Sequence, residues 1–178
     1  MQTRNIKRLV IWAIIIVSFL IGVGISFNAW SSQSQKRQTE LAMFVAQEAI
    51  NAQLELAQQG YASPDNALTI HLEPEVLPTF YFPDLDSYHI LSAWVFEDNM
   101  LNSINEQEVE KVAQNRDIFI YVIAIRTMKK NEALVEVLNI HPWNDTFSSR
   151  SGNESYWLLD YTGSEWEVVE KDVFAHWD

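Results

Sequence analysis

The feature that most constrains this chain is an uncharged apolar run near its N-terminus, from Leu9 to Phe27. As an α-helix, these nineteen residues would extend roughly 28 Å, which is close to the hydrocarbon thickness of a bilayer. An amphipathic core helix would show a polar stripe, and this run shows none. We therefore expect a transmembrane helix at residues 9–27, which follows a short tail at residues 1–8.

We expect this helix to stay attached to the mature protein as a signal-anchor. A cleaved signal peptide has a shorter apolar stretch and ends at a small-x-small site, which Phe27-Asn28-Ala29 matches poorly. A lipoprotein signal requires a cysteine, and the chain has none. The lack of cysteine also excludes disulfides, thiolate metal ligands and cysteine nucleophiles.

Basic residues near the apolar run indicate its orientation. Arg4, Lys7 and Arg8 precede the run, whereas Lys36 and Arg37 lie some distance past its other end. The positive-inside rule then places residues 1–8 in the cytoplasm and the C-terminal domain outside it. The sequence therefore predicts a single-pass protein of the cell membrane, in contact with the lipid bilayer, with an extracytoplasmic domain.

Small residues mark one face of the expected transmembrane helix. Ser18, Gly22 and Ser26 recur every four residues, so they line one side of an α-helix. Small side chains at this spacing permit close approach of a second helix, although such spacings also arise by chance. These three residues are a candidate packing site within the membrane.

The acidity of the chain is confined to the exported part. All 24 Asp and Glu residues lie from Glu40 onward, against seven Lys and Arg residues there, so this part carries a net charge near −17. Phosphate backbones repel such a surface, and nucleic acid is therefore excluded as an expected partner. The acidic domain is explained either by solubility or by a surface for cations or a basic partner.

The exported part begins with a segment of helical periodicity at residues 35–59. On a wheel of 3.6 residues per turn, its apolar residues fill an arc of more than half the circumference. A helix this apolar is expected to be largely wrapped by other elements, and Gly60 is a natural stop. We therefore divide the exported part into a juxtamembrane linker with the long helix, residues 28–59, and a remainder at residues 60–178.

Shorter periodic runs follow and predict a series of strands and one short helix. Ala67–Leu72 is either a short strand or a helical turn, and Ile104–Asn115 is a short helix with Ser103 or Asn105 as its cap. The predicted strands are Tyr88–Glu97, Ile118–Met128, Ala133–His141 and the two arms of a closing hairpin at residues 156–169.

The connections between the later strands predict the type of sheet. Lys129–Glu132 and Thr162-Gly163-Ser164 are tight turns, too short for a helical crossover. The sequence therefore predicts an α+β fold, in which the long helix packs on a curved antiparallel sheet of four to six strands. The aromatic residues expected to pack on that sheet are Tyr156, Trp157, Tyr161 and Trp166.

A proline-rich loop separates the first two predicted strands. Its prolines, Pro74, Pro78 and Pro83, forbid long regular structure, and its segment 80–82 reads Phe-Tyr-Phe. Phe80, Tyr81 and Phe82 either fold back as a lid on the core or form an exposed contact for a partner. We take these three residues as the candidate partner contact.

The order of elements and the ending WLLDYTGSEWEVVE, with a Gly turn before a Trp-x-Val strand, resemble the NTF2-like (cystatin-like) cone-fold superfamily over residues 35–175. A short basic tail, one membrane helix and an exported cone domain also resemble the bitopic scaffold subunit of type IV secretion systems. That resemblance implies an assembly subunit. A further resemblance is to pilin-like subunits, whose leader Gly and acidic residue in the apolar segment are absent here.

Few residues carry a pattern typical of chemistry. The histidines His71, His89, His141 and His176 show no short-spaced pair, so we expect no metal site. The chain contains no GxSxG elbow, Walker loop or GxGxxG sequence, and we expect no cofactor. Cone-fold enzymes use an Asp or Tyr inside the cavity, and Asp160 is the one candidate here.

These observations favour a non-enzymatic, membrane-anchored interaction subunit of a membrane or envelope complex, with other protein subunits as its partners. The alternatives are an extracytoplasmic NTF2-like module that binds a small ligand between helix and sheet, a pilin-like subunit and a cone-fold enzyme. An enclosed cavity with an inward carboxylate would favour a ligand-binding module or an enzyme. A filled core beside an exposed aromatic patch would favour the interaction subunit.

Overall fold

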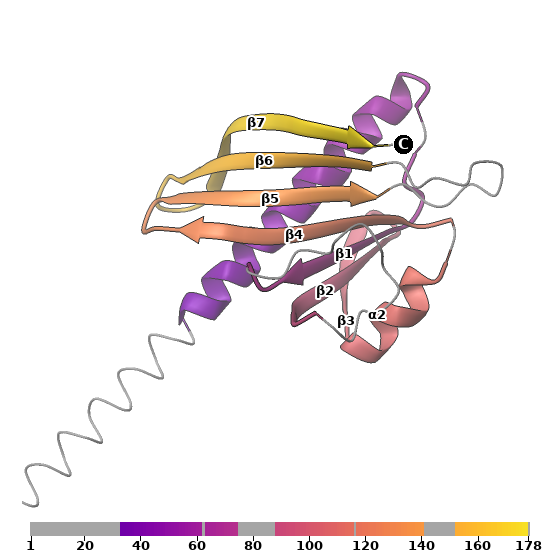
Figure 1. Ribbon diagram of the computed structural model, residues 1–178, viewed down its shortest axis with the longest axis horizontal. Helices are drawn as coiled ribbons and strands as arrows, with labels where there is room; N and C mark the ends of the chain where they lie inside the picture. The colour runs from indigo at the N-terminus through magenta and orange to yellow at the C-terminus, as the bar shows by residue number, and fades with distance from the viewer. Residues whose placement is uncertain (1–32, 62, 75–87, 116, 141–151, 178) are drawn as a thin grey trace, which may run out of the picture. The chain divides into compact units, whose positions relative to one another are not determined.

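The computed structural model describes residues 33–61, 63–74, 88–115, 117–140 and 152–177 (Figure 1). Backbone contacts separate the chain into two units, Met1–Gln38 and Thr39–Asp178. The described part of the first unit is the helical segment 33–38. The second unit contains helical residues 39–58, the short helix α2 and a seven-stranded sheet, which confirms the predicted α+β class.

The helix at residues 39–58 buries one side against the sheet. Its buried residues recur in pairs about one turn apart, which gives a single apolar stripe at a period near 3.6. On its other side, Met43 and Leu56 are each 42% exposed. The prediction of a largely wrapped helix was therefore wrong, because apolar residues outside the stripe face solvent. The stripe consists of Leu41, Ala42, Val45, Ala46, Ala49 and Ile50.

The long helix ends in a Schellman motif. The Tyr61 backbone N–H donates to the Leu56 carbonyl at 3.3 Å, and the Gly60 N–H donates to the Ala57 carbonyl at 3.0 Å. Gly60 adopts a φ of 97°, a conformation that residues with a Cβ rarely take. The predicted stop at Gly60 is therefore confirmed.

The sheet has the strand order β3-β2-β1-β4-β5-β6-β7. Strands β4 to β7 form an antiparallel meander, as predicted. Strand β1 also pairs antiparallel with β2. The strands are β1 (Ala67–Leu72), β2 (Ile90–Glu97), β3 (Met100–Ile104), β4 (Phe119–Met128), β5 (Glu132–Ile140), β6 (Gly152–Tyr161) and β7 (Trp166–Trp177).

Two features of the sheet differ from the prediction. It has seven strands rather than four to six, and it is mixed rather than antiparallel because β1 and β4 run parallel. Parallel neighbours require a long crossover connection, and β2, β3 and α2 lie in sequence between these two strands. Strand β3 was not predicted; Asp98 and Asn99, both with positive φ, form a two-residue turn that leads into it.

Helix α2, Glu106–Ala113, begins one residue after its cap. Asn105 accepts a hydrogen bond from the Glu108 backbone N–H, and the Glu108 side chain accepts one from the Asn105 N–H, each at 3.1 Å. The predicted short helix is confirmed, and of its two candidate caps, Ser103 and Asn105, the structure has Asn105. Ile104, which was predicted to be helical, belongs instead to β3.

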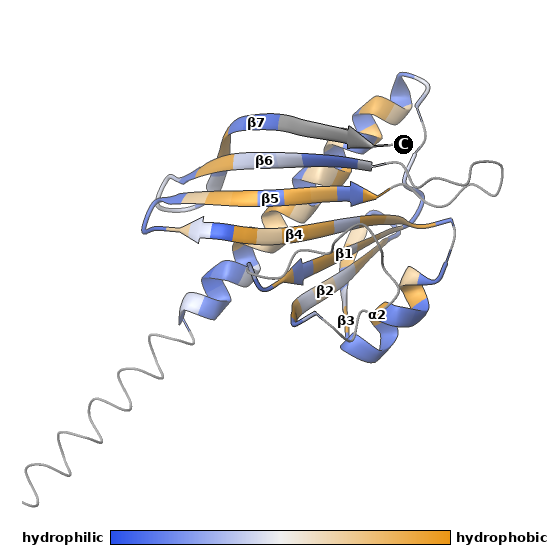
Figure 2. Ribbon diagram, viewed as in Figure 1, coloured by the Kyte–Doolittle hydropathy of each residue, from blue (hydrophilic) through white to orange (hydrophobic). Residues whose placement is uncertain are grey.

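The sheet has a core layer on each face. On one face, the helical stripe packs against residues of β1, β2 and β4 to β7. On the other face, Val109 of α2 packs with Leu68, Ile70 and Val95, so α2 covers the part of the sheet near β1 and β2. Figure 2 shows that hydrophobic residues concentrate along β4 and β5, in the middle of the sheet.

The aromatic residues of the closing hairpin lie on both faces. Trp157 and Trp166 are buried beneath the long helix, and the rings of Tyr161 and Trp166 are 5.1 Å apart. Tyr156 precedes Trp157 on the same strand and so points to the opposite face. The expectation that these residues pack on the sheet is confirmed, with Tyr156 half-buried on the face away from the long helix.

In the part of the chain that the structure describes, no helix combines the length and the hydropathy that crossing a bilayer requires. The expected transmembrane helix at residues 9–27 lies outside the described residues and stays a prediction.

We predict that Gly60→Ala lowers the free energy of unfolding by about 1 kcal/mol, measured by urea denaturation of the full chain in detergent. Nothing lies within 4 Å of the added Cβ, so the loss would come from the backbone conformation alone. The matched control is Gln59→Ala, which should change stability by less than about 0.5 kcal/mol. Equal effects of the two substitutions would contradict the role of the positive φ.

Candidate functional site

Several residues singled out in the sequence lie outside the part that the structure describes. The candidate partner contact Phe80, Tyr81 and Phe82 is among them, and so are Ser18 and the other small residues of the expected membrane helix, Gly22 and Ser26. The structure therefore leaves these predictions as they stand. The described residues contribute candidate groups on each face of the sheet.

Asp160 does not lie between the long helix and the sheet. Its neighbour Leu159 is buried in the helix-covered core, and successive strand residues point to opposite faces, so Asp160 projects away from that core and is exposed. Its partners across the sheet are Glu132 on β5 and Glu167 on β7. Asp160 is therefore not the inward carboxylate that a cone-fold enzyme uses.

The histidines have separate environments. His71 is buried in β1, and its Nδ1 lies 3.3 Å from the Ser92 hydroxyl oxygen. His89 is exposed, with its Nε2 3.9 Å from a Glu73 carboxylate oxygen, and His141 lies outside the described residues. Among described residues, no three His, Asp or Glu side chains converge in a way that could hold a metal ion.

A row of polar residues crosses the helix-covered face of the sheet. Thr69 on β1 pairs with Tyr121 on β4, and Tyr121 pairs with Asn139 on β5. The Thr69 Oγ1, the Tyr121 hydroxyl and the Asn139 Oδ1 are buried and have no hydrogen-bond partner among the described residues. Burial raises the pKa of Tyr121, so its hydroxyl stays protonated and can donate. Sequence reasoning missed this row because β4 reads as an almost continuous apolar run.

An ion pair lies on the opposite face. The Arg126 Nε–H donates to a Glu136 carboxylate oxygen at 2.5 Å, and the Arg126 guanidinium also donates to the Pro74 carbonyl. The Glu136 side chain is 1% exposed and that of Arg126 is 24% exposed. The guanidinium therefore neutralises a buried carboxylate and holds the chain after β1 close to β4.

Tyr156 lies beside this ion pair on β6, directly opposite Glu136. Partial burial raises the pKa of Tyr156, and the negative charges of Glu136 and Glu154 add to the effect. The hydroxyl therefore remains protonated at neutral pH and can donate to a neighbouring carboxylate.

The side chains around Tyr156 form one continuous surface, which we call the outer face. Register places them in rows, because residues paired across neighbouring strands project from the same side of a sheet. The residues of the outer face are Glu132, Leu134 and Glu136 on β5; Glu154, Tyr156, Leu158 and Asp160 on β6; and Glu167, Glu170 and Asp172 on β7.

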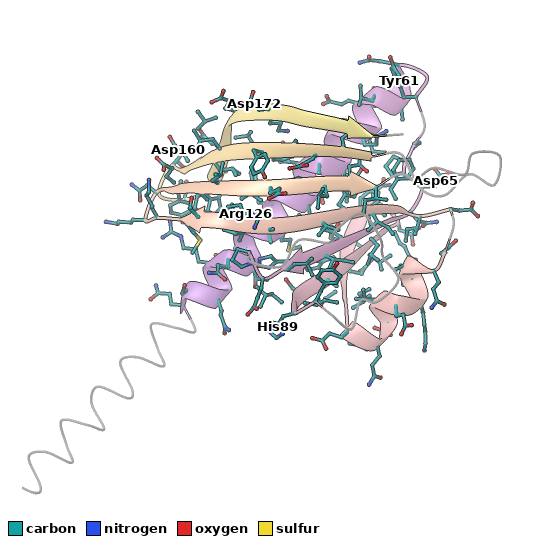
Figure 3. All side chains as sticks on the ribbon, viewed as in Figure 1. Tyr61, Asp65, His89, Arg126, Asp160 and Asp172 are labelled. Carbon is teal, nitrogen blue, oxygen red and sulfur yellow. The ribbon has the colours of Figure 1, made fainter. Side chains whose placement is uncertain are left out.

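Neither described helix packs on the outer face, although Glu136 within it is buried. Helix α2 packs on β1 and β2, and the long helix packs on the other face. Leu134, Tyr156 and Leu158 are therefore only half-buried. Figure 3 labels Arg126, Asp160 and Asp172, which mark this region from β4 to β7.

The charges of the outer face are almost all negative. Glu132, Asp160 and Glu167 lie directly opposite one another on three neighbouring strands. Like charges in that position destabilise a sheet. Lys129 offsets part of the repulsion, since its Nζ lies 2.7 Å from a Glu132 oxygen. Lys171 lies on the other side of the sheet, 3.9 Å from the centre of the Trp157 ring.

We predict that Arg126→Met lowers the free energy of unfolding by about 3 kcal/mol, because it leaves the buried Glu136 carboxylate unpaired. The double variant Arg126→Met/Glu136→Leu should recover most of that loss in denaturant unfolding. Lys129→Met removes the exposed pair with Glu132 and should cost less than about 0.5 kcal/mol. Additive losses in the double variant would show that the two side chains are not coupled.

Stability should also depend on His71. Burial lowers the pKa of His71 from 6.5 to about 4, so between these values the unfolded chain binds more protons than the folded chain. The contribution is complete above pH 6.5, and roughly 3 kcal/mol is lost as pH falls toward 4. We expect His71→Leu to flatten the pH dependence of unfolding in this window, whereas the exposed His89→Gln keeps it. An unchanged slope in His71→Leu would contradict this assignment.

Comparisons with known proteins found no matching family model, no matching curated protein and no matching solved structure.

Proposed function

We propose that this chain is a single-pass membrane protein whose exported α+β domain is a non-enzymatic interaction subunit of a membrane or envelope complex. The observation that carries this proposal is the outer face, where Leu134, Tyr156 and Leu158 are half-exposed within a charged rim. Protein interfaces commonly combine an apolar or aromatic centre with a polar rim. The opposite face of the same strands is filled by the long helix.

The membrane part of the proposal rests on sequence. The uncharged run Leu9–Phe27, preceded by Arg4, Lys7 and Arg8, supports an anchor with its N-terminus in the cytoplasm. An anchored domain diffuses in two dimensions, which raises its effective concentration near other membrane subunits. The resemblance to NTF2-like domains is part of the proposal as well. The long helix packed on a meander supports it, whereas the parallel β1–β4 pair departs from the sheet we expected.

The groups that could act in catalysis support a structural role better than a chemical one. Glu136 is buried but ion-paired with Arg126, and Asp160 is exposed. His71 lies beside the Ser92 hydroxyl, as in a nucleophile–base pair, but its pKa of about 4 makes it a weak base at neutral pH. Burial of the imidazole also separates it from any substrate in solution.

A second candidate function is the binding of a small polar ligand beneath the long helix. The observation that favours it is the row Thr69, Tyr121 and Asn139, whose buried polar atoms lack hydrogen-bond partners within the part of the chain that the structure describes. Such atoms cost free energy unless a ligand or an ordered water satisfies them. This candidate predicts a ligand that both donates and accepts hydrogen bonds.

The test is purification of the full chain from its native membrane in mild detergent, with identification of co-purifying proteins. We expect the wild type to retain a defined partner. Leu158→Arg, which places a charge on the outer face, should recover at least roughly tenfold less of that partner, since truncated or charged interface centres lose affinity most.

Leu56→Arg is the matched control, because Leu56 is also a partly exposed leucine but lies on the solvent side of the long helix. It should retain the partner. If the wild type emerges alone and monodisperse, the interaction-subunit proposal fails. If both variants retain the partner equally, the contact does not use the outer face.

A further inference from the structure

We infer that the outer face of β5–β7 binds a basic, extended polypeptide segment of a partner protein. This inference rests on the proposed function and adds to it the chemistry of the partner. It follows from the register of three strands, the half-buried residues between their charges and the behaviour of like charges on a sheet.

The register places carboxylates in three rows across β5 to β7. The first row is Glu132, Asp160 and Glu167. The next row lies two residues away on β5 and β6 and ends in Glu170, which a bulge places three residues after Glu167; the third row ends in Asp172. The edge strand β7 therefore contributes a carboxylate to each row. Rows two residues apart are separated by roughly 6.6 Å, which is also the distance between alternate side chains of an extended peptide.

The spaces between the carboxylates suit the side chains of Lys and Arg. Leu134 and Leu158 pair in the second row, and both are half-buried. The methylene stems of Lys or Arg can pack on these leucines while the charged ends reach the carboxylates. The half-buried ring of Tyr156 offers a surface on which a guanidinium can stack.

Charge selects this occupant over a second copy of the same chain. Two outer faces in contact would bring their carboxylate rows together, and like charges across an interface cost several kcal/mol. Arg126, the cation at the border of the face, is already paired with Glu136. It therefore does not neutralise the other carboxylates of the face. A basic segment would relieve the repulsion between Glu132, Asp160 and Glu167.

The probe is a synthetic ten-residue peptide that alternates Lys or Arg with Val or Thr, titrated into the full chain in detergent. We expect binding that weakens as salt rises. The triple variant Glu167→Gln/Glu170→Gln/Asp172→Asn should bind the peptide at least roughly tenfold more weakly than the wild type. A peptide with Glu in place of Lys and Arg should not bind.

The matched control removes the same number of charges elsewhere, as Glu55→Gln/Glu97→Gln/Glu110→Gln. These three side chains are exposed on the long helix, on β2 and on α2. The control should bind within about twofold of the wild type, because attraction to distant charges is screened. Equal losses in both triple variants, or no binding to the wild type, would overturn the inference. Salt-resistant self-association of the wild type, lost in the outer-face variant, would assign the face to a second copy instead.

The native partner separates this inference from the proposed function. If the partner co-purifies with the wild type and with the outer-face triple variant alike, the basic-segment inference fails while the interaction-subunit proposal stands. If nothing co-purifies with the wild type yet the basic peptide binds specifically, the basic-segment inference stands and the interaction-subunit proposal fails. Loss of the native partner in the outer-face variant alone supports both.

Discussion

The packing of the long helix on one face of the sheet determines most of what the rest of the chain can do. The helical stripe buries Val135, Val137, Trp157 and Leu159 on one side of β5 and β6. Because strand side chains alternate, the residues between them must point to the other side. That alternation puts Glu136, Tyr156 and their neighbours on the outer face. The same strand register thus buries apolar side chains under the long helix and places charged side chains on the outer face.

The parallel pair β1–β4 divides the sheet into two regions, which differ in whether a helix packs on one face or on both. On the β1–β2 side, α2 and the long helix lie on opposite faces of the sheet. Side chains that point to either face are therefore buried there, and all six residues of β1 are buried. On the β5–β7 side, α2 is absent and the outer face is half-exposed. The Arg126–Glu136 pair lies near the border, where the Pro74 carbonyl also accepts a hydrogen bond from Arg126. The crossover that creates the parallel pair therefore also places α2 on β1 and β2, away from the outer face of β5–β7.

Local signals predicted much of this fold, and long-range pairing did not follow from them. The closing hairpin, the β4–β5 turn and the Asn105 cap depend on residues close in sequence. Strand β3 was missed because Asp98-Asn99 lacks a glycine, although both residues tolerate positive φ. The parallel β1–β4 pair and the β5–β6 part of the carboxylate rows depend on pairing between segments that are farther apart in sequence, which no tight turn specifies. A Glu flanked by apolar residues in a strand, as in Leu134–Leu138, was the one signal for the buried ion pair.

The outer face is best tested by hydroxyl-radical footprinting of the chain in its native membrane and again after purification. Tyr156 and Trp157 are neighbours on β6 that point to opposite faces, and Tyr61 is an exposed reference at 65% exposure. We expect Tyr156 to be oxidised in the purified chain and protected in the membrane, with Trp157 protected and Tyr61 reactive in both. Equal oxidation of Tyr156 in the two states would contradict the claim that the outer face is covered by a partner.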